Sequence, residues 1–396
     1  MDPDKASLAP QADPAGRIPS LDILRGIALL GMFVVHFHAR STDPGGFDDV
    51  VRTLIWRLVE SKSHGTFALL FGAGFAIQLR RAEERGRPFA GLYLRRLLVL
   101  ALFGSAAHAF FGFNVLLGYA VWGMGLLLIR NWSTRTLLVA ACLSAISVAL
   151  YYLGETLYLT SSAGPEALGG AVQAQQAAAT AVNGALRAAA AQESYAVLLA
   201  ARLRHMAWFY AQPFSFMPGA TMALFISGLL LIRHRVFEDV SAHRRLLGAM
   251  ATFGVVSWLT QNWLLGYGPF GLLRDQWLMF AYVAGALLLL DRRPALVYAL
   301  RGVANAGRMA LTNYLIQIAA LDLLFSGYAL GLGRLRPVFG LAAAVACFAA
   351  EVVFSTFWLR SFRFGPAEWL WRSATYGHLQ PMRRSNVPAD PAPVSV

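Results

Sequence analysis

Residues 17–36 read RIPSLDILRGIALLGMFVVH, and this stretch decides the class of protein. Between Arg25 and His36 every residue is apolar or glycine. A helix that crosses a bilayer needs about 20 mostly apolar residues, because hydrocarbon offers the backbone no hydrogen-bond partner. The apolar run at 22–40 is therefore the first predicted membrane span.

Nine more apolar runs of this kind follow along the chain, which predicts an all-α, polytopic bundle of about ten transmembrane helices. Prolines at 213 and 218 predict a kink in the sixth span or a start at Pro218. The break after the third span is so short that the third and fourth spans are predicted to form a tight helical hairpin. The ten predicted spans are 22–40, 63–80, 94–112, 114–130, 134–153, 206–232, 244–265, 276–291, 308–328 and 337–359.

The composition of the whole chain agrees with a lipid environment. Of its 396 residues 57% are hydrophobic and only 14% charged, against roughly 25% charged in soluble domains. The net charge of +13 comes from short arginine clusters between apolar runs, which argues against a nucleic-acid partner and for topology signals. Cys142 and Cys347 both lie inside apolar runs, so no disulfide framework is indicated.

The distribution of basic residues predicts the orientation in the membrane. If the spans alternate, 24 of the 34 Lys and Arg residues fall on the side that holds both termini. The positive side is the cytoplasmic one, so both termini are predicted to be cytoplasmic. The predicted parts are a flexible tail at 1–20, one transmembrane domain at 21–378 and a disordered tail at 379–396.

The longest connection, about 154–205, falls on the outer side and is rich in Ala and Gln. Its strong helix formers favour one or two helices that lie on the membrane surface or cap an opening. An alanine-rich spacer is the equally weighted alternative.

The densest polar group opens the first span. Ser20 is placed to cap the helix, Asp22 suits the first turn, and Asp22 with Arg25 forms an i,i+3 pair. A capped helix with an interfacial ion pair would explain these residues. Alternatively, Arg17 and Arg25 face a cytoplasmic anionic ligand, which suits the geometry of guanidinium groups.

His36 lies eleven residues after Arg25, about 16 Å further along the helix axis. It is therefore predicted in the outer half of the membrane, where a neutral imidazole can take a proton from a hydroxyl or amine. A structural histidine bonded to a neighbouring helix is the alternative. His38 is rotated by about 200° on the helix and should face elsewhere.

Other polar residues in or beside the spans are candidates because such groups are costly in hydrocarbon. Hydrogen bonding between helices is the structural alternative for the amides. No metal-binding or nucleotide-binding motif occurs, and Gly72 and Gly74 are predicted to permit close helix packing. The residues predicted to line an internal tunnel are Glu60, His64, His108, Asn114, Asn313, Gln317 and Glu351.

Five blocks of sequence resemble one family. They are the opening RIPSLDILRGIALLGMFVVH, then LLFGAGFAIQLRR, YLRRLLVLALFGSAAH, GRMALTNYLIQ and FRFGPAEWLWRSATYG. In this order they are similar to the bacterial YeiB-like membrane proteins, whose C-terminal domain of unknown function 418 corresponds to about 230–378 here. The first helix also resembles that of transmembrane acyltransferases of the acyltransferase 3 and glucosaminide N-acetyltransferase types.

This resemblance implies a multi-pass protein of the bacterial inner membrane that transfers acyl groups. In acyltransferase 3 proteins an Arg-Gly pair is followed by a functional histidine, which Arg25, Gly26 and His36 resemble. Many YeiB-like members have asparagine at the position of His36 and aspartate at that of Asn114.

The implied enzyme moves an acyl group from cytoplasmic acyl-CoA, its co-substrate, to a glycan or lipid acceptor of the envelope. Arg17 and Arg25 would hold the diphosphate of acyl-CoA, Asp22 would orient Arg25, and His36 would act as the base. No tightly bound cofactor and no metal are expected.

Two alternative functions would use the same residues. A transporter or small-molecule binding protein would use the polar groups as a site near the middle of the membrane, without chemistry. A membrane scaffold would use them only for helix packing.

Overall fold

The computed structural model describes residues 17–42, 45–112, 114–212, 215, 219–260 and 274–384, and the regular elements in these ranges are all helices. This confirms the all-α fold class. The first helices are α2 (Pro19–His38), α3 (Phe47–Leu58), α4 (Lys62–Glu84), α5 (Ala90–Phe111), α6 (Leu116–Ile129), α7 (Thr134–Ala163), α8 (Pro165–Ala190) and α9 (Tyr195–Ala211). They are followed by α10 (Gly219–Arg233), α11 (Arg244–Thr260), α12 (Arg274–Arg292), α13 (Pro294–Ala299), α14 (Arg301–Arg308), α15 (Ala310–Phe325), α16 (Pro337–Ser361) and α17 (Pro366–Tyr376).

In its described part, each predicted span lies mainly on a helix, and the sixth is divided between the end of α9 and α10, which begins at Gly219. The end of the seventh, 261–265, lies outside the described residues. In the described part of the chain, four helices are long and apolar enough to cross a membrane, namely α2, α5, α7 and α16. Three shorter apolar helices are α6, α10 and α15. The protein is thus a helical membrane protein, and the full number of ten crossings stays a prediction.

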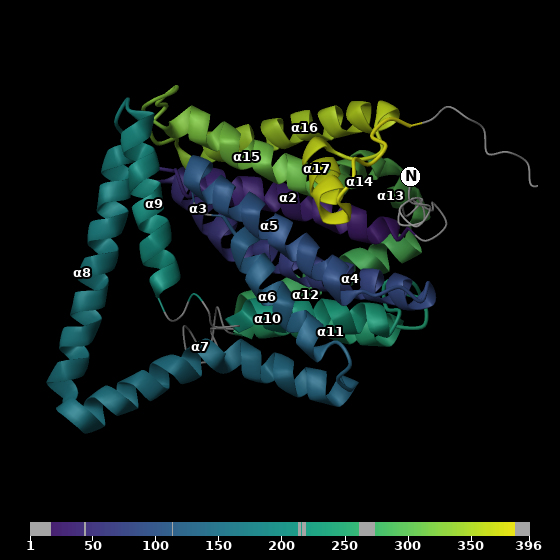
Figure 1. Cartoon of the computed structure of the whole chain (residues 1–396), viewed down its shortest axis with the longest axis horizontal. Coiled ribbons are helices and arrows are strands. Elements are labelled where there is room, and N and C mark those ends of the chain that lie inside the picture. Colours follow the sequence, from purple (N-terminus) through teal and green to yellow (C-terminus); the bar gives the residue numbers. More distant parts are fainter. Residues whose placement is uncertain are drawn as a thin grey trace, which may run out of the picture.

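The long helices lie lengthwise in one bundle (Figure 1). α2 is its central member and packs against α4, α14, α15 and α16. Of the apolar part of α2, 72% is buried, against 11% for α7 at the periphery. The first span is therefore surrounded by protein, whereas α7 leaves most of its surface exposed.

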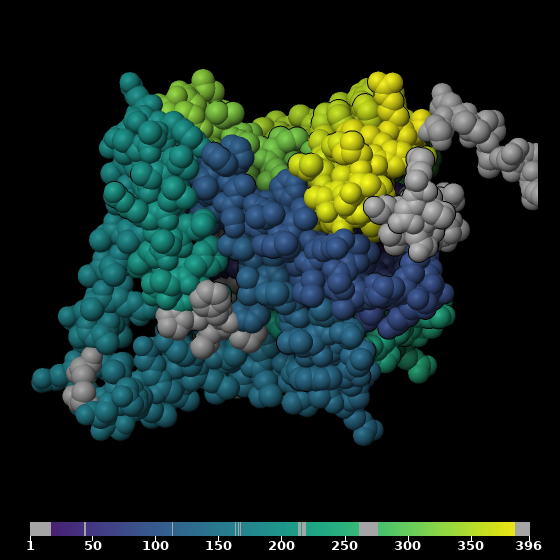
Figure 2. All heavy atoms as spheres, in the orientation of Figure 1, coloured from purple at the N-terminus to yellow at the C-terminus, as the bar shows by residue number. Residues whose placement is uncertain are grey.

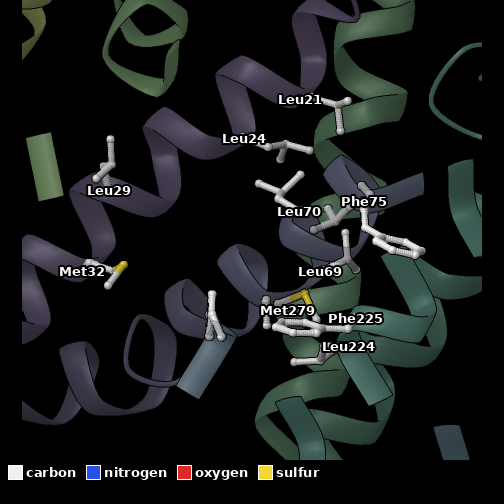
Figure 3. Close-up of a cluster of buried hydrophobic side chains, with 14 of the residues drawn as sticks. Leu21, Leu24, Leu29, Met32, Leu69, Leu70, Phe75, Leu224, Phe225 and Met279 are labelled. Atoms are coloured by element: carbon white, nitrogen blue, oxygen red, sulfur yellow. The ribbon is translucent and has the colours of Figure 1, made fainter. Parts of the chain in front are cut away.

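Glycines set the closest helix contacts. A Cβ at Gly72 of α4 would overlap the carbonyl oxygen of Phe225 in α10, and one at Gly228 would overlap that of Leu69. Figure 3 shows the apolar side chains gathered around this contact. At Gly26 and Gly307 the same closeness joins α2 to α14. The predicted packing role is confirmed for Gly72, while a Cβ at Gly74 would approach only Arg25 Nη2, at 3.9 Å.

The segment predicted as an outer connection, 154–205, is helical. It consists of the end of α7, all of α8 and the beginning of α9. Figure 1 shows α8 and α9 crossing one end of the bundle, roughly perpendicular to the long helices. This arrangement fits helices that lie along a membrane surface, and their relation to the bilayer stays a prediction.

At the end of the bundle that α8 and α9 cross, α3 is hydrogen-bonded to the start of α16. Asp48 is buried, and its carboxylate accepts hydrogen bonds from Arg336 Nε at 2.6 Å and the Val338 backbone N–H at 3.1 Å. The second bond caps the first turn of α16, where the helix dipole favours a negative charge.

The two ends of the described chain lie together at the opposite end of the bundle. Arg17 and Arg384 both act electrostatically on Arg308. This agrees with an even number of crossings. The predicted tails lie largely outside the described residues, at 1–16 and 385–396.

The structure differs from the prediction where the C-terminal tail begins. The backbone N–H of Arg363 donates to the carbonyl of Met382, and the N–H of Arg384 donates to Ser361. Trp369 Nε1 also donates to the carbonyl of Gln380. Residues 379–384 are therefore packed against the folded domain, because the backbone between α16 and α17 offers them partners.

Candidate functional site

The N-terminal end of α2 holds a charged triad. Arg17 Nε lies 2.8 Å from Asp22 Oδ2, and Arg25 Nη1 lies 2.9 Å from Asp22 Oδ1. The Asp22 side chain is 8% exposed, against 52% for Arg17 and 27% for Arg25. One buried carboxylate therefore orients two guanidinium groups that remain open to a ligand. The expected cap at Ser20 is wrong: the N-cap is Ile18, and Pro19 provides the first turn.

Three further arginines approach this triad from other helices. Arg308 of α14 is near Arg17 and Asp22, and Arg96 of α5 is near Arg25 and Arg372 of α17. We call Arg17, Arg25, Arg96, Arg308 and Arg372 the inner arginine cluster. The sequence prediction treated the last three only as topology charges. Their shared side and their position at helix ends were the available signals.

Two arginines of this cluster, Arg308 and Arg372, lie outside the spanning helices. Burial lowers the pKa of Arg308 to about 10, and it also lowers the pKa of Arg372. Neighbouring arginines act in the same direction, while Asp22 and Glu368 respectively oppose them. Arg308 therefore remains charged at neutral pH, in surroundings that favour an added anion.

Glu368 of α17 has a structural role. Its carboxylate accepts from the backbone N–H groups of Leu311 at 2.7 Å and Thr312 at 3.2 Å, and from Thr312 Oγ1 at 2.5 Å. Burial raises its pKa even though these bonds act against the rise. A Cβ at Gly365 would crowd Thr312 Oγ1 and Met309. The Gly-Pro-Ala-Glu segment thus docks α17 onto the first turn of α15.

The C-terminal half of α2 places His36 beside His64. Their ring centroids are 6.2 Å apart, and Tyr314 of α15 lies at the same centroid distance from His36. Tyr119 fixes the backbone by donating to the carbonyl of His64 at 3.1 Å. His36 Nδ1 is buried and has no hydrogen-bond partner among the described residues. We call His36 and His64 the outer histidine pair.

Between the two ends lies a polar network of α2, α15 and α16. Gln317 Nε2 donates to Glu351 Oε2 at 2.9 Å and to the Leu29 carbonyl at 3.4 Å, and Asn313 Nδ2 donates to Ser355 Oγ at 2.9 Å. Asn313 and Gln317 are fully buried, so both amides lie inside the bundle. Because Gln317 bonds to Leu29, which lies between Arg25 and His36 on α2, the network lies between these two residues. Glu351 is thus paired with an amide.

The remaining tunnel candidates have other partners. His108 Nε2 lies 3.4 Å from His205 Nδ1 of α9. Asn114 closes the hairpin of α5 and α6, because its side chain donates to the Gly104 carbonyl at 2.9 Å and accepts from the Leu116 N–H at 3.1 Å. Glu60 acts electrostatically on His38. The structure brings only His64, among the predicted outer candidates, directly to His36.

A buried ion pair between Arg202 and Asp322 was not predicted. Arg202 also donates to the Phe110 carbonyl, and Asp322 accepts from Ser326 Oγ at 2.6 Å and Tyr328 Oη at 2.9 Å. The pair ties α9 to α5 and α15. Asp322 inside a predicted span was the available signal, because a buried carboxylate requires a partner.

Comparisons with known proteins place these elements in a family. Residues 231–378 match the family described as protein of unknown function (DUF418), and residues 17–162 match the heparan-alpha-glucosaminide N-acetyltransferase catalytic family. The first match contains Arg308, Glu368 and Arg372, and the second contains the triad and the outer histidine pair. No solved structure matches the chain.

Full-length relatives cover nearly all of the chain. The Bacillus subtilis protein YxaH is 31% identical over 93% of this chain and 96% of its own length. The Escherichia coli protein YeiB is 27% identical over 90% of this chain and 95% of its own length. Both are described as uncharacterized proteins. This chain belongs to the YeiB-like family of DUF418 membrane proteins, with an acetyltransferase-like N-terminal region.

Proposed function

We propose that the protein is a transmembrane acyltransferase that takes an acyl group from cytoplasmic acyl-CoA and delivers it to an acceptor on the outer side of the inner membrane. The observation that carries the proposal is the layout of α2. Arg17, two residues before the helix, and Arg25 in it are oriented by one buried carboxylate at its N-terminal end, and further along the same helix lies a histidine whose Nδ1 has no partner among the described residues. The match to an acetyltransferase catalytic family over the same residues supports it.

The reaction assigns a role to each end. Arg17 and Arg25 bind the diphosphate of acyl-CoA, because guanidinium groups suit phosphate oxygens. His36 accepts the proton of an acceptor O–H or N–H while the acceptor oxygen or nitrogen bonds to the acyl carbon. The carbon–sulfur bond of the thioester breaks, and CoA leaves as a thiolate that is then protonated.

The polar network between the ends fits a route for the acyl-carrying arm. Asn313 Oδ1, Gln317 Oε1 and Glu351 Oε1 are buried acceptors without a partner among the described residues. Buried polar atoms without a partner are uncommon, and each calls for an explanation. Amide N–H groups of the pantetheine arm would satisfy them as the thioester moves toward His36.

A transporter is the second candidate, because the same three unpaired oxygens lie between the two ends of α2, as a binding site would. The two candidates differ in what happens to the thioester. An acyltransferase consumes acyl-CoA and leaves its label on the acceptor, whereas a transporter leaves the thioester intact.

The test is acyl transfer in membrane vesicles from a strain that lacks the gene and expresses single variants. Vesicles receive labelled acetyl-CoA on the cytoplasmic side, and the label in envelope glycans and lipids is measured. Loss of a general base typically costs about 100-fold to 10,000-fold in rate, so His36→Ala should transfer almost nothing. His38→Ala is the matched control on the same helix. Transfer by His36→Ala at the rate of the unchanged protein would remove His36 from the reaction.

A further inference from the structure

The inner arginine cluster has two parts on different helices. Arg17 and Arg25 share Asp22 at the start of α2, and Arg308 of α14 lies beside them. Arg96 and Arg372 come from α5 and α17 and lie near one another. Electrostatic interactions of Arg25 with Arg96, and of Arg17 with Arg372, connect the two parts. Two neighbouring cationic sites therefore face one end of the bundle.

Aromatic contacts hold the second part in place. The guanidinium of Arg96 lies 3.7 Å from the ring centroid of Trp371, whose Nε1 donates to the Arg96 carbonyl at 2.9 Å. The guanidinium of Arg372 lies 4.5 Å from the ring centroid of Phe364. A cation stacked on a ring keeps its N–H edge available for hydrogen bonds. Figure 2 shows the C-terminal segment, in yellow, packed against the blue helices at this end.

The carboxylates near the cluster are bonded to groups other than this second part. Asp22 is shared by Arg17 and Arg25, and Glu368 is used by the first turn of α15. In the described part of the chain, Arg96, Arg308 and Arg372 form no ion pair with a carboxylate. Asp22 and Glu368 act on Arg308 and Arg372 only through space, so the neighbouring arginines still repel one another, and a bound anion relieves that repulsion.

We propose that Arg96 and Arg372 bind a second phosphate group of the ligand, the 3′-phosphate on the ribose of acyl-CoA, while Arg17, Arg25 and Arg308 bind its diphosphate. This inference rests on the proposed function. It assigns a role to the DUF418 region: α14 and α17 complete the coenzyme site begun by α2. Coenzyme A carries two separate phosphate groups, which matches two cationic sites better than a ligand with a single phosphate.

The discriminating experiment compares two ligands. Purified full-length protein in a neutral detergent is titrated with acetyl-CoA and with acetyl-3′-dephospho-CoA by isothermal titration calorimetry. A hydrogen bond to a charged group is worth about 1.5–3 kcal/mol, so the unchanged protein should prefer acetyl-CoA by roughly tenfold to a hundredfold. Arg372→Gln should lose most of this preference and bind the dephospho ligand as before. Arg25→Gln should weaken both ligands.

Two further variants complete the design. Arg372→Lys keeps the charge and the packing of the side-chain stem, so it should retain part of the preference. Arg245→Gln removes an exposed arginine of α11 outside the cluster and should change neither affinity. If Arg372→Gln does not give a monodisperse protein, Arg372→Lys and Arg96→Gln decide the question.

The outcomes separate this inference from the proposed function. An unchanged preference in the Arg372 and Arg96 variants, or an equal loss for both ligands, would overturn the assignment of the second phosphate site. No binding of acetyl-CoA by the unchanged protein would overturn the proposed function itself. Adding vesicles of anionic lipid tests the competing source of phosphate, since displacement of acetyl-CoA by lipid alone would assign the cluster to headgroups.

Discussion

Many polar side chains inside the bundle already have hydrogen-bond partners within the protein. This distinguishes residues with a structural role from residues that are free to take part in chemistry. Asn114 closes a hairpin, and Glu368 caps α15. In contrast, His36 Nδ1 and Glu351 Oε1 have no partner among the described residues. The sequence identifies Asn114, His36 and Glu351 as costly in a membrane, but not which of them the fold would satisfy, because many of the partners come from distant segments.

Asp48 gives a prediction about pH. Burial alone would raise its pKa, but the bonds from Arg336 and the Val338 N–H outweigh burial, so the pKa is lowered from 3.8. A carboxylate with a lowered pKa stabilises the fold above its unfolded-state pKa, and this contribution is lost as the pH falls through the folded-state pKa.

We therefore expect the thermal unfolding midpoint of the unchanged protein in detergent to fall more steeply than that of Asp48→Asn between about pH 5 and pH 3. Asp49→Asn is the control, because Asp49 is half exposed and pairs only with Arg52, at 3.3 Å. Parallel curves for the unchanged protein and Asp48→Asn would contradict the role of Asp48.

Among the helices, the sequence predicts the long apolar ones well and the short amphipathic ones poorly. All ten predicted spans fall on helices, because a run of apolar residues is a local signal. α3, α14 and α17 lack such a run, and they form through contacts with residues far along the chain, such as Asp48 with Arg336 and Gly307 with Gly26. This is why Arg308 of α14 and Arg372 of α17 were not predicted as members of the cluster.

Gly72 and Gly74 of α4 give a matched pair of variants. A methyl group at Gly72 would overlap the Phe225 carbonyl, whereas one at Gly74 meets only Arg25 Nη2 at 3.9 Å. Overpacking costs about 1–3 kcal/mol or more, and Gly→Ala in an open helical position stabilises by roughly 0.5–1 kcal/mol. Gly72→Ala should therefore lower the unfolding midpoint in detergent, and Gly74→Ala should leave it unchanged or higher. Equal midpoints would show that α4 and α10 can separate without cost.

For the whole molecule, the distribution of basic residues predicts the orientation, and the structure supplies the relation between the two ends. The inner arginine cluster and both described chain ends lie at one end, and α8 and α9 cross the other. Neither result places a membrane around the bundle. The sidedness therefore remains open to a direct experiment.

Cysteine labelling tests this orientation. After Cys142 and Cys347 are replaced by alanine, single cysteines are introduced at Gln176 on α8 and at Arg245 on α11, both exposed positions. A membrane-impermeant maleimide should label the cysteine at 176 in intact spheroplasts and the cysteine at 245 only after permeabilisation. The reverse pattern would invert the protein and remove cytoplasmic acyl-CoA from the proposed reaction.

The burial of α2 has a consequence for biosynthesis. Its partners at Gly307 and Gln317 belong to the last third of the chain. At about 5–20 residues per second, the ribosome reaches them on the order of half a minute after Asp22 and Gly26 have left it. During that interval the first helix must wait in the lipid, or against the translocon or a chaperone, with its polar face uncovered. Nascent chains that end before α14 should therefore be substrates for membrane proteases.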